Sequence, residues 1–340
     1  MRRLQATLLT LFVLFALEAK AQRNPPLKLI ATTPLPDLVG DLEFFAADVK
    51  GNRLFLCAED GKTVEVFDLR TGKRIHSIKG FVAPHDVLIL PDSNKFIVTD
   101  GNEGFGGVEL LSGETYAVID KIKLPKEVDD GVFNPFNKYF YVESGSDEPG
   151  AKTHFLNIID TKNFRLVGNI TLPGNRNDAM AIDSTGKKLY ANNAGTSAVI
   201  VVDLETRKVI ASWPLPGTKG LNGLALDEAN HRLFSATRNP PKLFVLNTDN
   251  GKIIATYPCA SYNDHLTFDA PRKRIYITGD SASVFEQRDA DHYDLIADIP
   301  TATRAKTSLY VPELNRLYIA VSGKGNSGAK LAVQIYQVEP

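Results

Sequence analysis

Short apolar runs recur along the chain at a nearly constant interval, and polar turn residues bound each of them. The clearest copy, residues 189–192, reads Leu-Tyr-Ala-Asn and lies between turn segments at 184–187 and 193–196. Period-two alternation of apolar and polar residues is typical of β-strands, and clusters of Gly, Asn, Asp and Thr are typical of the turns between them. Seven segments superimpose in this way, at residues 54–57, 96–99, 140–143, 189–192, 233–236, 275–278 and 317–320.

The first residues of these segments are 42, 44, 49, 44, 42 and 42 positions apart. A period in the low forties, with several short strands in every unit, is typical of a β-propeller blade. In one unit the alternation predicts strands at 178–183, 188–192, 198–203 and 209–215. The sequence therefore predicts an all-β protein, a seven-bladed β-propeller with four-stranded antiparallel blades.

The two ends of the chain are expected to share one blade. The last unit starts at Thr307 and ends after its third strand, at residues 329–338, so its outermost strand is missing. Residues 29–36 (Leu-Ile-Ala-Thr-Thr-Pro-Leu-Pro) match the fourth-strand residues 209–216 (Val-Ile-Ala-Ser-Trp-Pro-Leu-Pro). We therefore predict that the N-terminal strand completes the seventh blade, which removes an exposed sheet edge. Residues 27–340 are expected to form a single seven-bladed domain.

The first 21 residues are predicted to be a secretory signal peptide. Arg2 and Arg3 form a basic n-region, residues 8–17 are an apolar run, and residues 19–21 form an A-x-A cleavage site. The run is too short for a transmembrane helix. No later segment is apolar for long enough to cross a bilayer, so we expect a periplasmic or secreted protein that does not span the membrane.

Charge and cysteine content exclude some classes of function. The formal net charge is −1, and the longest basic run is residues 272–274. Nucleic acid is not expected as a partner, because binding to its backbone needs a clustered basic surface. Cys57 and Cys259 fall in the first and fifth units, too far apart around a ring to form a disulfide. We expect both to be unpaired.

The strand motif resembles the Tyr-Val-Thr-Asn repeat of the YVTN-type, YncE-like family of exported seven-bladed propellers. The resemblance covers the chain from about Leu29 to the C-terminus, although the copies at 54–57 and 233–236 keep only the apolar pattern. It implies the seven-bladed fold and an exported protein. It implies little about activity, because propellers carry many unrelated functions.

Candidate binding residues come from the innermost strands, whose first residues are expected near one mouth of the central channel. Counting back ten or eleven residues from each motif gives one position per unit: Glu43, Asp86, Asp129, Asp178, Asn222, Asp264 and Thr307. Asp130 follows one of these positions, and His85 and His265 flank two others. Arg238 lies before residues 239–241 and is expected to form a salt bridge or to contact an anion. We predict that the acidic positions, Asn222 and the two histidines face one cavity.

Two interpretations of these carboxylates stay open. In the structural one, each carboxylate accepts backbone N–H groups from a neighbouring blade's loop. In the functional one, crowded carboxylates need a counter-charge, so the mouth binds a cation, or a cationic or polyhydroxylated ligand. Oxygen ligands alone would favour Ca²⁺ or Mg²⁺, whereas His85 or His265 would favour a transition metal. The metal-ligand candidates are Glu43, Asp129, Asp178 and Asp264.

Two functions are compatible with these features. The favoured one is an exported, monomeric scaffold that binds a small molecule or a protein on its loop face. Three long loops, at 100–107, 143–153 and 322–330, are expected to border the mouth, and insertions on one face of a repeat protein often mark its binding face. The alternative is a divalent-metal-dependent hydrolase or lyase acting on a lactone or sugar derivative, with His85, His154 or His265 transferring a proton.

Overall fold

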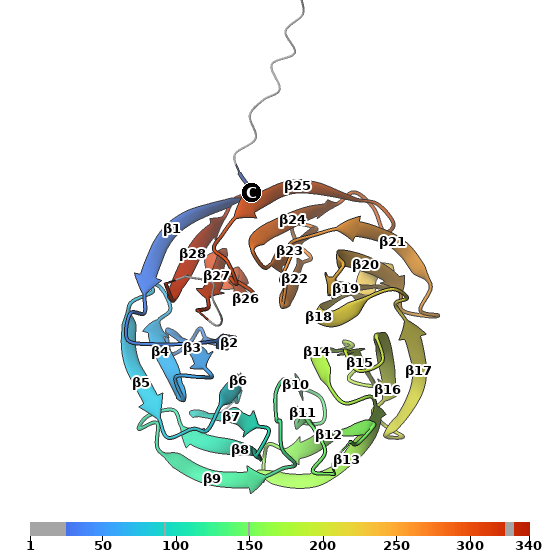
Figure 1. Ribbon diagram of the computed structural model, residues 1–340. Helices are drawn as coiled ribbons and strands as arrows, with labels where there is room; N and C mark the ends of the chain where they lie inside the picture. Colours follow the sequence, from blue (N-terminus) through green and yellow to red (C-terminus); the bar gives the residue numbers. More distant parts are fainter. Residues whose placement is uncertain (1–24, 92, 149, 324–329) are drawn as a thin grey trace, which may run out of the picture.

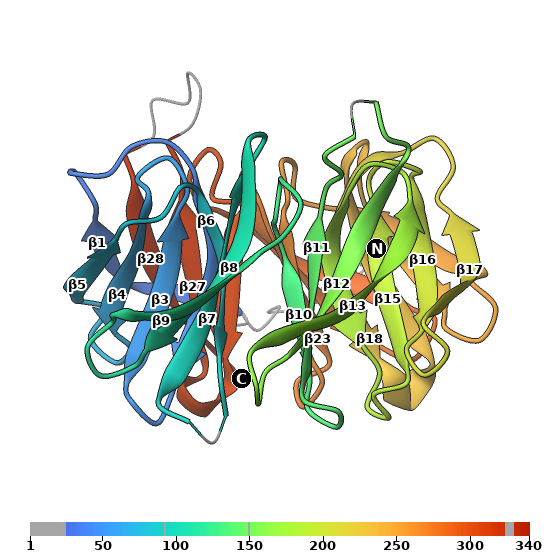
Figure 2. The same cartoon turned by 90° about the horizontal axis from the view of Figure 1, so that it is seen from below.

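Seven four-stranded antiparallel sheets surround a central channel (Figure 1). The computed structural model describes residues 25–91, 93–148, 150–323 and 330–340. The predicted signal peptide lies outside these residues, as do residues 324–329 of the third predicted loop. Figure 2, turned by 90°, shows the strands running between the two faces of the disc, so that the connecting loops gather on those faces.

Six blades are built from four consecutive strands each. The first three are β2 (Leu42–Asp48), β3 (Arg53–Ala58), β4 (Thr63–Asp68) and β5 (Arg74–Lys79); β6 (Pro84–Ile89), β7 (Lys95–Asn102), β8 (Phe105–Ser112) and β9 (Val118–Lys123); and β10 (Gly131–Asn134), β11 (Tyr139–Ser144), β12 (Thr153–Asp160) and β13 (Arg165–Pro173). The next three are β14 (Asn177–Ile182), β15 (Lys188–Asn193), β16 (Ala198–Asp203) and β17 (Lys208–Pro214); β18 (Lys219–Asp227), β19 (Arg232–Asn239), β20 (Pro241–Asn247) and β21 (Ile253–Pro258); and β22 (His265–Asp269), β23 (Arg274–Thr278), β24 (Ser281–Gln287) and β25 (Tyr293–Pro300). Short 3-10 turns, η1 (Glu228–Asn230) and η2 (Pro312–Leu314), follow β18 and β26.

The seventh blade combines both ends of the chain, as the sequence predicts. It contains β26 (Thr307–Val311), β27 (Arg316–Val321), β28 (Ala332–Val338) and β1 (Leu27–Pro34), with β1 paired antiparallel to β28 on the rim (Figure 1). The Leu35 N–H continues this contact by donating to the Leu331 carbonyl at 2.8 Å. Leu27 and Leu35 are buried. Hydrogen bonds and apolar burial therefore close the ring together.

The hydrophobic core of the described residues is divided among the interfaces between neighbouring blades, with one cluster at each. Between the first two blades, for example, the rings of Phe55 and Phe96 lie 5.0 Å apart. A blade in the ring has a neighbour on both faces, so its middle strands are buried on both faces. This explains why β3 is apolar along almost its whole length and buried at every residue but Arg53.

A one-residue bulge interrupts the outermost strand of every blade. The residues left without a ladder partner are all β-branched and apolar: Ile30, Ile75, Ile119, Val167, Ile210, Ile254 and Ile296. A bulge increases the local twist and disturbs the free edge of a strand, which hinders edge-to-edge pairing with another chain. The seven outer edges on the rim are protected in this way.

Removal of β1 should destabilise the ring. A variant without residues 1–34 exposes the edge of β28 and loses the buried Leu27. We expect this variant to aggregate, or to melt at a temperature at least about 10 °C below that of a control that lacks only residues 1–24. Differential scanning fluorimetry with light scattering measures both effects. Equal melting of the two proteins would contradict closure by β1.

Candidate functional site

The pairing of the β-ladders identifies the residues at the channel mouth. In every blade, the third residue of the recurring four-residue motif pairs with a residue of the innermost strand. From the first blade to the seventh, these paired residues are Phe45, Val87, Gly131, Met180, Leu224, Leu266 and Ser308. The residues two positions earlier all line one cavity of about 430 Å³: Glu43, His85, Asp129, Asp178, Asn222, Asp264 and Lys306. We call these seven residues the ring.

The ring differs from the predicted one at two positions. Asp86 and Thr307 do not line the cavity, and the preceding residues, His85 and Lys306, take their places. Counting back ten residues instead of eleven produced both errors. Because alternate residues of a strand point to opposite faces, a shift by one residue moves a side chain to another surface. The other five predicted positions, with Arg238, do share the cavity.

Two predicted binding residues, Asp86 and Asp130, are not among the residues that line this cavity. Each carboxylate accepts the N–H of the residue that follows it, from Val87 at 2.7 Å and from Gly131 at 2.8 Å. Burial raises the pKa of Asp86 to about 7 and the pKa of Asp130 well above its usual range. The prediction that both face the mouth was wrong.

Two of the three histidines proposed for proton transfer are also absent from the cavity wall. His154 is completely buried, with Nδ1 3.2 Å from the Gly174 carbonyl and Nε2 3.9 Å from a Glu143 oxygen, and burial lowers its pKa. His265 packs against Phe44, with ring centroids 5.9 Å apart, and burial lowers its pKa to about 4. The hydrolase alternative therefore retains one of its three candidates, His85.

His85 is held in the cavity wall by both ring nitrogens. Nδ1 lies 2.9 Å from the Ala83 carbonyl, and Nε2 lies 3.9 Å from a Glu59 oxygen. Burial lowers the pKa of His85, but the carboxylates of Asp129, Glu43 and Glu59 outweigh burial and raise this pKa overall. The neighbouring carboxylates therefore favour the protonated form of the imidazole.

Four ring residues lie in β-bulges of the innermost strands. In each of the strands β2, β6, β14 and β18, two consecutive residues have no partner in the ladder. The first of the two is Glu43 in β2, His85 in β6, Asp178 in β14 and Asn222 in β18. A bulge releases a residue from the ladder and re-aims its side chain. In β18 the second of the two is Gly223, where a Cβ atom would lie 2.6 Å from the Leu266 Cβ. Glycine allows the neighbouring innermost strand to approach this closely.

Lys306 supplies the counter-charge that the sequence analysis lacked. Its Nζ lies 3.0 Å from both carboxylate oxygens of Glu43 and 2.8 Å from Asp264 Oδ2, and Lys306 is only 4% exposed. Burial lowers the pKa of Lys306, but the surrounding carboxylates outweigh burial and raise it, so the ammonium is charged. Burial raises the pKa of Glu43 to about 7 despite this contact, whereas Lys306 and Arg238 outweigh burial and lower the pKa of Asp264.

Arginines pair with two ring carboxylates, Asp178 and Asp264, the second of which also contacts Lys306. The guanidinium of Arg238 donates to Asp264 Oδ1 at 2.6 Å and to the Asn263 carbonyl at 2.7 Å, so the salt bridge foreseen for Arg238 is present. Arg176 forms a short ion pair with Asp178 Oδ1. Burial still raises the pKa of Asp178 to about 7, because Arg176 offsets only part of it.

A second layer of cavity residues lies two positions before the ring residues. It includes Asp41, Arg176, Tyr262 and Arg304. The guanidinium carbons of Arg304 and Arg238 lie 4.5 Å and 5.1 Å from the centre of the Tyr262 ring, and Arg304 Nη2 donates to Asp41 Oδ2 at 3.1 Å. Sequence reasoning missed this layer, although the period-two rule applied to the ring positions points to it.

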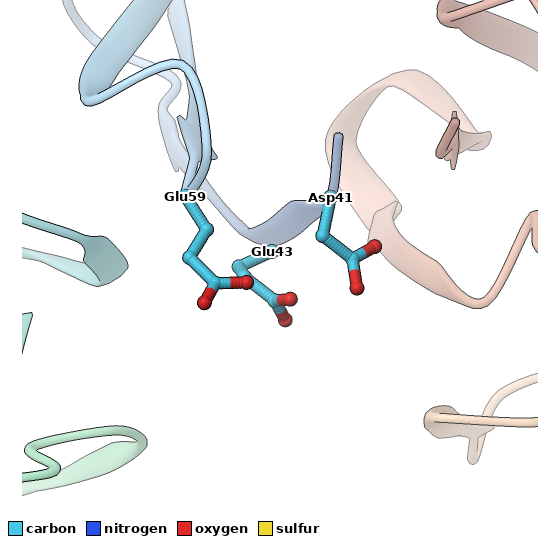
Figure 3. A group of neighbouring side chains, drawn as sticks. All are labelled: Asp41, Glu43 and Glu59. Atoms are coloured by element: carbon cyan, nitrogen blue, oxygen red, sulfur yellow. The ribbon is translucent and has the colours of Figure 1, made fainter. Parts of the chain in front are cut away.

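Asp41, Glu43 and Glu59 point into the same space (Figure 3). Oxygen atoms from these three carboxylates lie within 4.8 Å of one another, a spacing that a metal ion can bridge. Both Glu43 oxygens, however, already accept hydrogen bonds from Lys306, and Asp41 accepts one from Arg304. Among the described residues, the predicted metal ligands Glu43, Asp129, Asp178 and Asp264 do not form such a group.

A second cavity of about 370 Å³ adjoins the first and shares Glu59, His85, Asp129 and Arg176 with it. Residues of two of the predicted long loops line it, namely Gly101, Asn102, Glu103, Glu143 and Gly145. These two loops therefore border the mouth. Cys57 and Cys259 are unpaired, as expected.

Comparisons with known proteins support the resemblance to the YncE-like propellers. No family model matches the chain. The curated relative named "Uncharacterized protein YncE" from Salmonella typhimurium is 26% identical over 170 residues, which are 49% of this chain and 48% of the relative. The protein of the same name from Escherichia coli (strain K12) is 30% identical over 101 residues, 29% of this chain and 28% of the relative. The chain is a seven-bladed propeller that is similar in sequence to these YncE proteins.

Solved structures share the fold of this YncE-like propeller. "Kuenenia stuttgartiensis Hydrazine Synthase" superimposes with a TM-score of 0.74 at 18% identity, covering 89% of this chain and 97% of that one. "Crystal Structure of Mitotic Checkpoint Complex" gives a TM-score of 0.75 at 16% identity, covering 99% and 100%. At these identities the likeness shows the fold alone. The chain spans about half the length of the Salmonella YncE relatives that it matches.

Substitution of two aspartates by asparagine separates the structural and functional interpretations. Among the described residues, the Asp129 carboxylate accepts no hydrogen bond, whereas the buried Asp100 carboxylate accepts the N–H groups of Val82 and Ala83. We expect Asp129→Asn to change the free energy of unfolding by less than about 0.5 kcal/mol, or to stabilise. Asp100→Asn, the matched control, should cost about 1–3 kcal/mol. Urea titrations measure both. An equal loss in the two variants would support a structural Asp129.

Proposed function

We propose that this protein is an exported ligand-binding scaffold and that the charged cavity at the channel mouth binds a small polar molecule. The observation that carries the proposal is the buried ion network around Lys306. Replacing buried ion pairs with apolar residues of similar volume is often neutral or stabilising, so stability alone does not explain charges here. Strongly perturbed pKa values, such as those of Glu43 and Asp178, cluster at functional sites.

The asymmetry of the ring supports the same proposal. Seven equivalent positions carry Glu, His, Asp, Asp, Asn, Asp and Lys, whereas the equivalent positions between blades stay apolar. A residue needed by each blade for its own stability would recur in every unit. Unlike side chains at equivalent positions instead suit a ligand whose groups differ from one side to the other.

The proposed setting follows from the N-terminal sequence. Residues 1–21 have the features of a secretory signal peptide, which supports a periplasmic or secreted location for a monomeric domain of residues 27–340. Among the described residues, no helix has the length and apolar character needed to cross a membrane. The surrounding loop face is the proposed contact surface for a small molecule.

Ligand-induced stabilisation tests the proposal. The probes are 1,4-diaminobutane, sucrose and CaCl₂, which represent the amine, polyhydroxylated and metal-ion classes. We expect at least one probe to raise the melting temperature measurably, because binding to the folded state alone stabilises it. Arg238→Ala, in the cavity wall, should abolish the shift, and Arg165→Ala, at an exposed position on β13, should retain it.

Isothermal titration calorimetry of the active probe then gives its affinity for the parent and both variants. The proposal is contradicted if none of the three probes binds the parent protein, or if Arg238→Ala binds the active probe as tightly as the parent does.

A further inference from the structure

Hydrogen bonding divides the ring into two arcs. In the first arc Lys306 donates to Glu43 and Asp264, and His85 contacts a backbone carbonyl and Glu59. In this arc the lysine ammonium satisfies the two carboxylates. The second arc, which we call the acceptor arc, is formed by the ring residues of the third, fourth and fifth blades: Asp129, Asp178 and Asn222.

Each residue of the acceptor arc has a side-chain oxygen that accepts no hydrogen bond among the described residues. Asn222 is 1% exposed, and its Nδ2 donates to Asp264 Oδ1 at 2.8 Å. This bond fixes the orientation of the amide, because a carboxylate needs a donor. It leaves Asn222 Oδ1 buried with no hydrogen-bond partner in the described part of the chain, and the same holds for Asp178 Oδ2. Asp129, as noted above, accepts no hydrogen bond there either.

An unsatisfied buried acceptor costs free energy. Asp178 and Asn222 each have one such oxygen, and the neighbouring Asp129 carboxylate accepts no hydrogen bond among the described residues, which indicates that a bound molecule supplies the missing donors. We propose that the acceptor arc binds the primary ammonium group of a small organic amine, which names the ligand class of the binding function proposed above. An ammonium group offers three N–H donors, and the arc offers two carboxylates and one amide oxygen.

The charge of the cavity favours a cation. Among the described residues, its wall contains six carboxylates (Asp41, Glu43, Glu59, Asp129, Asp178 and Asp264) against four cationic side chains (Arg176, Arg238, Arg304 and Lys306). Glu43 and Asp264 share Lys306, and Asp178 has Arg176 on one oxygen. Asp129 lies at the border of the two cavities and forms no salt bridge among the described residues, although its charge also acts on His85 and Arg176. The remaining negative charge is therefore centred on the acceptor arc.

The surroundings suit an ammonium group better than a divalent metal ion. Ca²⁺ takes six to eight oxygen ligands, mostly charged, whereas the arc contributes three side chains, one of them a neutral amide. The guanidinium of Arg176 is bonded to Asp178 and would repel a double charge more than a single one. The adjoining cavity, which shares Asp129, gives the rest of an aliphatic amine room to extend.

Calorimetric titration of the full-length protein tests the inference. The probe is 1,4-diaminobutane at pH 8 and constant ionic strength. Tetramethylammonium, which has the same charge per nitrogen but no N–H donor, and CaCl₂ are the comparison ligands. We expect the diamine to bind at least tenfold more tightly than either of them. Asp129→Asn should weaken diamine binding at least tenfold, whereas Asp120→Asn, at an exposed position on β9, should leave it unchanged.

Each other outcome contradicts the inference. Equal binding of tetramethylammonium would mean that charge alone is recognised, and preferential binding of Ca²⁺ would identify a metal site. Unchanged diamine affinity in Asp129→Asn would place the amine elsewhere. If sucrose binds in an Arg238-dependent way and no amine does, the binding function stands and the ammonium site falls. Melting curves of both variants show whether they are folded.

Discussion

The ammonium group of Lys306 is the interaction on which the channel mouth depends. Lys306 directly precedes β26 in the last blade, and its Nζ contacts Glu43 of the first blade and Asp264 of the sixth. It therefore joins three blades across the seam of the ring at the channel, while the β1–β28 pairing closes the same seam at the rim. Removal of this charge would leave the buried Glu43 carboxylate without its donor, whereas Asp264 would keep Arg238 and Asn222. An unpaired buried charge costs far more than the ion pair itself contributes.

The contacts of Lys306 also explain why the opposite side of the ring has acceptors left for a ligand. Lys306 and Arg238 satisfy the carboxylates of the sixth and first blades, whereas Asp129, Asp178 and Asn222 line the cavity and each keep an oxygen without a hydrogen bond among the described residues. A symmetric repeat thus acquires a directional site. The bulges in β14 and β18 contribute, since they detach two of these residues from the ladder.

The fold could be predicted from the sequence because the strand and turn patterns that determine it are local. Each unit repeats the same strand and turn pattern, and the missing fourth strand of the last unit has its match near Leu29. The residues of the candidate site could be predicted only in part. The choice of Asp86 over His85, and of Thr307 over Lys306, followed from a one-residue error in locating strand starts, which no apolar pattern corrects. Partners such as Lys306 and Asp264 meet only through the packing of whole blades.

The free energy of unfolding of Lys306→Met at pH 5 and pH 8 tests the central role of Lys306. Glu43, with a pKa of about 7 in the folded protein, is protonated at pH 5 and ionised at pH 8. A raised folded-state pKa makes stability fall as pH rises above the unfolded value, and loss of Lys306 raises the pKa of Glu43 further. The account predicts a loss of about 3–5 kcal/mol at pH 8, a smaller loss at pH 5, and no change for the exposed control Lys208→Met. A small loss that is equal at both pH values would contradict it.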